Sequence, residues 1–125
     1  MLLNYLAVGA GGFLGSILRY TLNLFFPDTG FPITTLAINV IGSFAMGLFA
    51  AMVLSGFIQD QRLSLFLRVG LCGGFSTMAA FSVQSLHLIQ QGDYALAVLY
   101  VAVTGALCIA AAFAGDCLVN MQTQR

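Results

Sequence analysis

The sequence predicts an all-α membrane protein with four transmembrane helices and no separate soluble domain. Hydrophobic residues make up 60% of the 125 residues and charged residues only 6%, against about a quarter in typical soluble domains. So few charges could not cover the surface of a water-soluble globule. Four apolar segments, each long enough to cross a bilayer, follow one another with short polar connections. These two observations predict the fold class.

The four predicted spans make up one domain, residues 1–125, and cover residues 2–26, 33–58, 63–90 and 94–115. Pro27 and Gly30 mark the turn after the first span, and the polar residues 59–62 follow the second. The polar sequence QQGD ends the third span and leads into the fourth. His87 lies near the end of the third span, where we expect it at the membrane interface rather than in a metal site.

Several function classes fit this composition poorly. A net charge near zero argues against nucleic acid as a partner. The sequence shows no nucleophile–base pair and no metal-ligand spacing, so we expect no enzyme. A small proton-coupled multidrug transporter remains an alternative, although it needs a carboxylate within the membrane, and the four Asp residues all lie at span ends or in loops. A non-conducting structural membrane subunit is the other alternative.

Polar positions inside the first two spans stand out. In the first span, Gly11 and Gly15 form a small-x-x-x-small pattern that favours close helix packing. Arg19 follows, either extended to the membrane surface or attracting anions at a pore mouth. In the second span, Asn39 is either a helix–helix hydrogen-bond partner or a donor to an anion. Thr35 and Ser43 lie four residues on each side, so the three form a polar stripe on one helix face.

The strongest signal is the stretch GLCGGFSTMAAFS, residues 70–82, in the middle of the third span. Its three glycines either unwind the helix or allow close contact with a neighbour. Unwound backbone within a membrane is tolerated where protein or a cavity satisfies it, and such breaks are typical of ion-binding sites. We therefore predict a break between Gly73 and Thr77, with free carbonyl groups that suit a cation and amide dipoles that suit an anion.

Three segments together resemble the Fluc, or CrcB, family of fluoride channels. They are GGFLGSILRY (11–20), TTLAINVIGSFAMG (34–47) and GLCGGFSTMAAFS (70–82), and the similarity covers nearly the whole chain. The resemblance implies an antiparallel, dual-topology dimer with two pores in the inner (plasma) membrane. It also implies passive export of cytoplasmic fluoride, and so fluoride resistance.

The resemblance assigns roles to individual residues. Asn39 matches the pore asparagine, and Phe81 matches a phenylalanine whose electropositive ring edge faces the anion. Arg19 matches an arginine near the vestibule. The backbone carbonyls of Gly73 and Ser76 match the ligands of a structural sodium ion at the dimer centre. With these, the predicted fluoride pore comprises Asn39, Phe81, Met78, Thr35, Ser43 and Thr77.

The chain departs from the family pattern directly after the break. Met78 stands where the family has a phenylalanine, Ala79 and Ala80 replace a serine and a threonine, and Gln84 replaces an acidic residue. A thioether and two methyl groups offer a dehydrating anion no hydrogen-bond donors. Two explanations remain open: a homodimer with altered pores, and one subunit of a heterodimer with a related chain in which this segment has degenerated.

Overall fold

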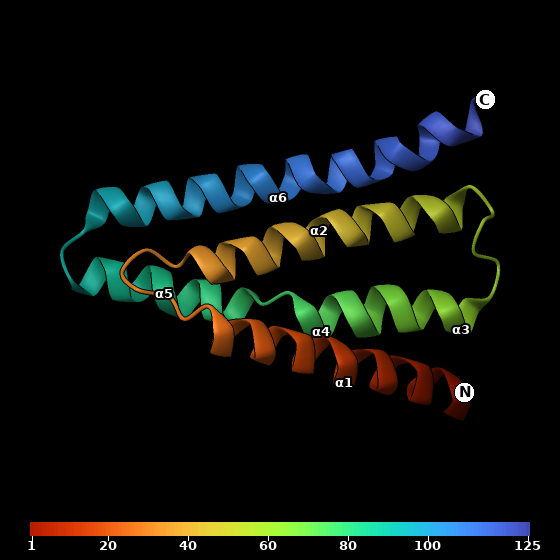
Figure 1. Ribbon diagram of the computed structural model, residues 1–125, viewed down its shortest axis with the longest axis horizontal. Helices are drawn as coiled ribbons and strands as arrows, with labels where there is room; N and C mark the ends of the chain where they lie inside the picture. Colours follow the sequence, from red (N-terminus) through yellow and green to blue (C-terminus); the bar gives the residue numbers. More distant parts are fainter.

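The computed structural model describes all 125 residues, and its regular structure is entirely helical (Figure 1). The elements are α1 (Leu2–Phe25), α2 (Ile33–Leu54), α3 (Gln61–Ser64), η1 (Leu65–Cys72), α4 (Gly73–Phe75), α5 (Met78–Gln90) and α6 (Tyr94–Thr123). The segment from α3 to α5 forms one interrupted rod, so four rods are long and apolar enough to cross a membrane. The predicted all-α, four-span fold is confirmed, and the chain is a multi-pass membrane protein.

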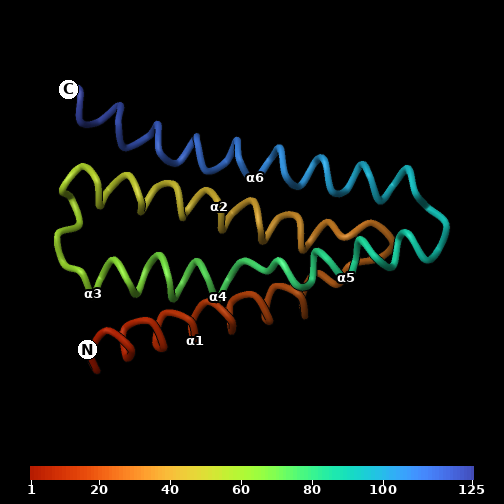
Figure 2. Tube along the Cα trace, turned by 180° about the vertical axis from the view of Figure 1, so that it is seen from behind, coloured from red at the N-terminus to blue at the C-terminus, as the bar shows by residue number.

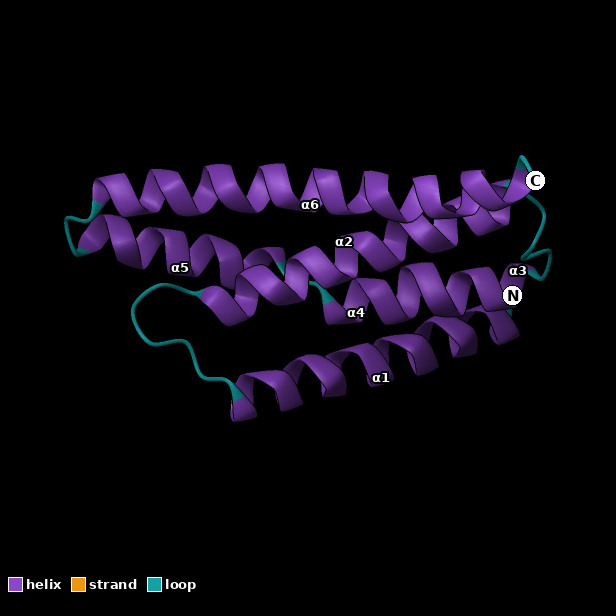
Figure 3. Ribbon diagram, turned by 45° about the horizontal axis from the view of Figure 1, so that its top comes forward, coloured by secondary structure: helices purple, strands orange, loops and turns teal.

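The four rods lie side by side in the order α6, α2, α3–α5 and α1 (Figures 1 and 2). Both termini and the α2–α3 connection lie at one end of the bundle, and the α1–α2 and α5–α6 connections lie at the other end (Figure 3). Only 18 of the 125 residues are buried. A single subunit therefore leaves most of its apolar surface to lipid or to a partner.

Two helix ends differ from the predicted spans. Helix α2 ends at Leu54, because the chain turns at Gly56, whose φ of 79° is readily adopted only by glycine. Helix α6 continues to Thr123, eight residues past the predicted end of the fourth span. Its 30 residues extend about 45 Å at 1.5 Å per residue, which exceeds the roughly 30 Å hydrocarbon core. Helix α6 is therefore long enough to extend past the hydrocarbon or to cross it at a tilt.

Helix α1 packs backbone to backbone against the third rod. A Cβ atom added at Gly11 or Gly15 would overlap the backbone of η1 and α4, and one added at Gly70 or Gly74 would overlap the backbone of α1. Both helices thus carry glycines four residues apart at their contact, which is the geometry that the α1 pattern predicts. Gly70 and Gly74 of the third rod therefore allow close contact with α1, whereas a Cβ at Gly73 would meet only the Arg68 carbonyl, at 3.9 Å.

Helix α2 packs along α6 in the same way, with Gly47 and Gly115 each against the backbone of the other helix. Near the α5–α6 connection, Tyr100 is fully buried and packs edge-on against the ring of Phe31, with centroids 5.5 Å apart. Phe81 of α5 completes this cluster, its ring centroid 5.2 Å from that of Tyr100. These contacts fix α2, α5 and α6 around the broken segment.

Candidate functional site

The third rod is interrupted at Ser76 and Thr77, where the connection between α4 and α5 is drawn as a loop (Figure 3). Both residues have extended backbone, with ψ angles of 154° and 112°. Gly73 remains helical, so the break occupies the C-terminal part of the predicted range. The eight residues before α4 form a π-helix, a distortion that is frequent near functional sites.

Asn39 of α2 bridges the break by pairing with the backbone of Thr77. Its Oδ1 accepts a hydrogen bond from the Thr77 amide at 2.7 Å, and its Nδ2 donates to the Thr77 carbonyl at 3.1 Å. The asparagine is 9% exposed, so these bonds satisfy backbone groups that would otherwise be buried without partners. The predicted helix–helix bond is therefore present. Nδ2 carries two hydrogens, and one of them remains for another acceptor.

Two backbone carbonyls at the break lose the donors that a continuous helix would supply. The Thr77 amide, which would bond to the Gly73 carbonyl, donates to Asn39 instead. The Ala80 amide, which would bond to the Ser76 carbonyl, donates to the Thr77 hydroxyl at 3.3 Å. Gly73 is also exposed on the outer side of the rod. Neutral oxygens freed in this way suit a weakly held cation, so both residues fit a sodium site.

Arg19 reaches the break from α1. Its Nε donates to the carbonyl of Gly74 at 3.2 Å, across 55 residues of sequence. This contact ties the side chain to the last turn before the break. A fixed positive charge beside a polar break attracts anions.

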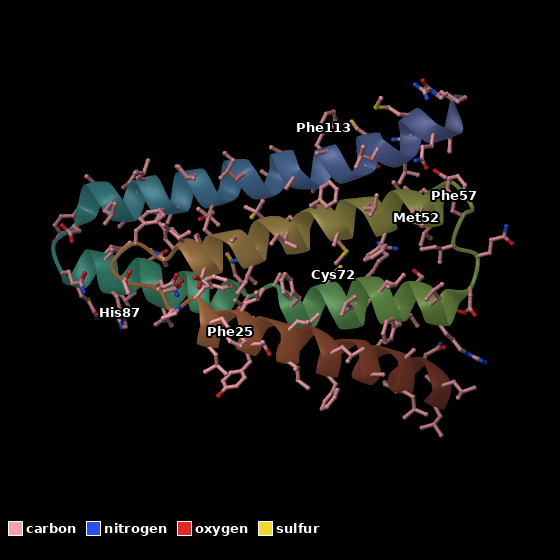
Figure 4. All side chains as sticks on the ribbon, viewed as in Figure 1. Phe25, Met52, Phe57, Cys72, His87 and Phe113 are labelled. Carbon is pink, nitrogen blue, oxygen red and sulfur yellow. The ribbon has the colours of Figure 1, made fainter.

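A groove of about 300 Å³ opens where the break, α2 and α6 meet. Most of the predicted pore residues line it, together with one predicted sodium ligand: Asn39, Ser43, Thr77, Met78, Phe81 and Ser76. The groove is open on one side, since Met78 is 73% exposed. The structure thus brings together side chains that the sequence placed on two different spans. Gly73 and Arg19 do not line the groove. His87 projects outward from α5, far from the groove (Figure 4).

One wall of the groove comes from α6, which sequence analysis missed. Thr104, Gly105 and Cys108 line it. Thr104 is only 6% exposed, and its Oγ1 has no hydrogen-bond partner. A buried hydroxyl without a partner is costly and therefore uncommon. The available signal was the spacing of Tyr100, Thr104 and Cys108, each four residues apart on one face of an otherwise apolar helix.

A hydrogen-bonded cluster closes one end of the groove. Thr35 is 2% exposed and lies one helical turn from Asn39, outside the groove itself. Its hydroxyl donates to Asp28 Oδ2 at 3.2 Å and accepts from Gln84 Nε2 at 2.8 Å. Gln84 Nε2 also lies 3.1 Å from Asp28 Oδ2, and Gln84 Oε1 accepts from the Tyr100 hydroxyl at 3.0 Å. This cluster, Asp28–Thr35–Gln84–Tyr100, joins the α1–α2 connection to α2, α5 and α6.

Comparison with known proteins identifies the family. Residues 6–116 match the family described as CrcB-like protein, camphor resistance. The chain belongs to the CrcB-like family. Its relatives include proteins named fluoride-specific ion channel FluC, which resemble it over nearly their whole length. The protein from Ruminiclostridium cellulolyticum is 36% identical over 95% of this chain and 94% of the relative. The protein from Chlorobaculum tepidum is 39% identical over 94% of this chain and 95% of the relative. The protein from Paramagnetospirillum magneticum is 41% identical over 91% of this chain and 93% of the relative.

Membership of the CrcB-like family confirms the resemblance drawn from the three sequence segments, and it indicates a channel rather than an enzyme. The matched range contains every residue of the groove and of the Asp28–Thr35–Gln84–Tyr100 cluster. The broken rod, the groove and the cluster therefore all lie within the part of the chain that matches the family.

Proposed function

We propose that this chain is a subunit of a fluoride channel that lets fluoride leave the cytoplasm passively and so confers fluoride resistance. The observation that carries the proposal is the groove itself. It combines the free N–H of Asn39, the hydroxyls of Ser43 and Thr77, and the buried, unpartnered hydroxyl of Thr104. A dehydrated anion needs such donors in place of its water. An anion that reached Thr104 Oγ1 would supply the partner that this buried hydroxyl lacks.

Phe81 supports the same assignment. Its ring lines the groove and is held by Tyr100 behind it, and a ring edge is electropositive. The remaining predicted pore side chain, Met78, offers a polarizable thioether but no donor. Anion binding in this groove therefore depends on α2, on α6, on the Thr77 hydroxyl at the break and on Phe81.

We also propose that the channel is an antiparallel dimer in the membrane. One subunit leaves the groove open beside Met78, and its buried fraction is small. A second subunit is needed to close the wall against lipid. A homodimer and a heterodimer with a related chain both meet this need, and the first turn of α5, with Met78, Ala79 and Ala80, is where this chain departs from the family pattern.

A structural sodium ion belongs to the same proposal. The carbonyls of Gly73 and Ser76 lack their helical donors, and a cation held by them would neutralise the negative end of the half-helix that precedes the break. Because only backbone oxygens serve, the side chain at position 76 is free to be serine. If the site binds sodium, the purified protein should unfold at a higher temperature in sodium chloride than in N-methylglucamine chloride at equal ionic strength.

Fluoride efflux from liposomes tests the main proposal. Vesicles are loaded with potassium fluoride, the membrane potential is cancelled with valinomycin, and a fluoride electrode follows the release. Efflux from vesicles holding this chain alone supports a homodimer, and efflux only with a second related subunit supports a heterodimer. Absence of fluoride efflux in both cases, from protein that is folded and inserted, contradicts the proposed function.

A further inference from the structure

We propose that the carboxylate of Asp28 is a tethered competitor for the permeating anion, which takes up the hydrogen-bond donors at one end of the groove. The inference rests on the proposed fluoride conduction. It concerns whether the permeating anion or the carboxylate occupies the hydrogen-bond donors at that end of the groove. Asp28 lies in the connection between α1 and α2, and the turn in which it lies shows no sequence motif for a functional site.

The cluster lies one helical turn beyond the groove on each of its three helices. Thr35 precedes Asn39 on α2 by four residues, and Tyr100 precedes Thr104 on α6 by four. On α5, which runs in the opposite direction, Gln84 follows Phe81 by three. Each of these steps leads toward the α1–α2 connection (Figure 1). The cluster therefore forms the end wall of the groove, where an anion leaving in that direction must pass.

All donors in the cluster point toward Asp28. The Tyr100 hydroxyl donates to Gln84, the Gln84 amide donates to Thr35 and Asp28, and the Thr35 hydroxyl donates to Asp28. The carboxylate fixes this order, because turning the Gln84 amide over would place its oxygen against Asp28. With the Asp28 carboxylate accepting these bonds, the end of the groove has no free donor for an anion.

Asp28 itself is half-buried, whereas two members of its cluster are almost fully buried. Thr35 and Tyr100 are 2% and 0% exposed, so interactions between charges are weakly screened there. The partners of the carboxylate are neutral: the amide of Thr34 at 2.7 Å, the hydroxyl of Thr35 and the amide of Gln84. An anion arriving at this end meets an uncompensated negative charge and must also displace it from its donors.

The replacement Asp28→Asn removes the negative charge that would compete with an anion, while it keeps the hydrogen bond by which the residue supports the start of α2. Its carbonyl oxygen still accepts from the Thr34 amide, which preserves the start of α2. Its NH₂ group faces Gln84, so the Gln84 amide turns over and the order of donors reverses. The hydroxyls of Thr35 and Tyr100 then become available to an anion. Asp93→Asn is the matched control, because Asp93 lies at the same end of the bundle, is exposed, and its side chain caps nothing.

The test measures initial fluoride efflux over a range of internal fluoride concentrations. Asp28→Asn should lower the half-saturating fluoride concentration about tenfold, the size expected for removing one nearby charge in a partly buried site, and Asp93→Asn should leave it unchanged. Adding Gln84→Glu to Asp28→Asn returns one carboxylate and one amide to the cluster and should restore the wild-type value. Equal half-saturation in the two single Asp variants, or loss of efflux in folded Asp28→Asn, overturns the inference.

Thermal unfolding of the same variants gives a second measurement that needs no conduction. Gln84→Glu alone sets two carboxylates against each other and should lower the unfolding temperature, whereas the double variant Asp28→Asn with Gln84→Glu should recover it. Failure of the double variant to recover shows that the cluster is not ordered by a single carboxylate. If the wild-type channel shows no fluoride efflux, the proposed function is contradicted. The unfolding temperatures still test whether a single carboxylate orders the cluster.

Discussion

Replacing Asn39 with alanine removes both hydrogen bonds that join α2 to the break. The Thr77 amide then loses its 2.7 Å bond to Oδ1 and the Thr77 carbonyl its 3.1 Å bond to Nδ2. A buried polar group without a partner costs about 1 to 3 kcal/mol. Two such groups put the expected loss of stability at about 2 to 6 kcal/mol, enough to disorder the break and to abolish fluoride efflux.

Ser43→Ala is the matched control for this variant. Ser43 lines the same groove from the same helix, four residues further along, but it does not hold the break together. Its replacement should change the unfolding temperature little and reduce efflux only in part. Asn39→Asp completes the set, because it keeps the acceptor for the Thr77 amide while placing a negative charge in the groove. We expect it to retain more stability than Asn39→Ala and to lose efflux.

The assays are thermal unfolding in detergent and fluoride efflux from liposomes at equal protein density. If Asn39→Ala unfolds at the wild-type temperature, the pairing with Thr77 does not hold the break, and the structural part of the argument is refuted. If a folded Asn39→Ala variant conducts normally, the anion takes a path that does not involve this side of the groove.

Three further predictions concern other parts of the same account. Gly11→Ala should strongly destabilise the protein, since a Cβ there would overlap the backbone of η1, whereas Gly9→Ala should be tolerated because nothing lies within 4 Å; unfolding temperatures that do not separate the two would contradict the proposed packing. Thr104→Val should keep or raise the unfolding temperature while lowering fluoride efflux, because the lost hydroxyl has no partner within the chain; unchanged efflux would remove Thr104 from the pathway. Met78→Phe adds a ring edge at the open side of the groove and should raise efflux; a lower rate in correctly folded protein would show that the thioether is the better fit.

Local signals in the sequence predict much of this architecture. Apolar segments of membrane-spanning length give the four rods, and glycine spacing gives the contact surface of α1. The break is predicted from the glycine cluster followed by Ser76 and Thr77 within an apolar run, and the stripe that includes Asn39 is predicted from helical periodicity. Each of these features depends on residues close together in the sequence.

Features that depend on distant residues could not be predicted in this way. Gln84 meets Asp28 across 56 residues and Thr35 across 49, and a turn residue such as Asp28 gives no local sign of such a partner. Thr104 is ordinary in sequence and becomes notable only because packing against α2 and α5 leaves its hydroxyl buried without a partner. Gly70 and Gly74 of the third rod likewise acquire their role from the backbone of α1.

Modification of Cys108 tests most directly whether anions pass through the groove. Cys108 lines the groove, whereas Cys72 is buried between α4 and α2 (Figure 4) and Cys117 lies nine residues further along α6. Methyl methanethiosulfonate adds a small apolar group to the thiol, and mass spectrometry shows which cysteine carries it. The account predicts that labelling Cys108 stops fluoride efflux and that Cys108→Ser channels are resistant to the reagent. Full efflux from channels labelled at Cys108 would contradict it.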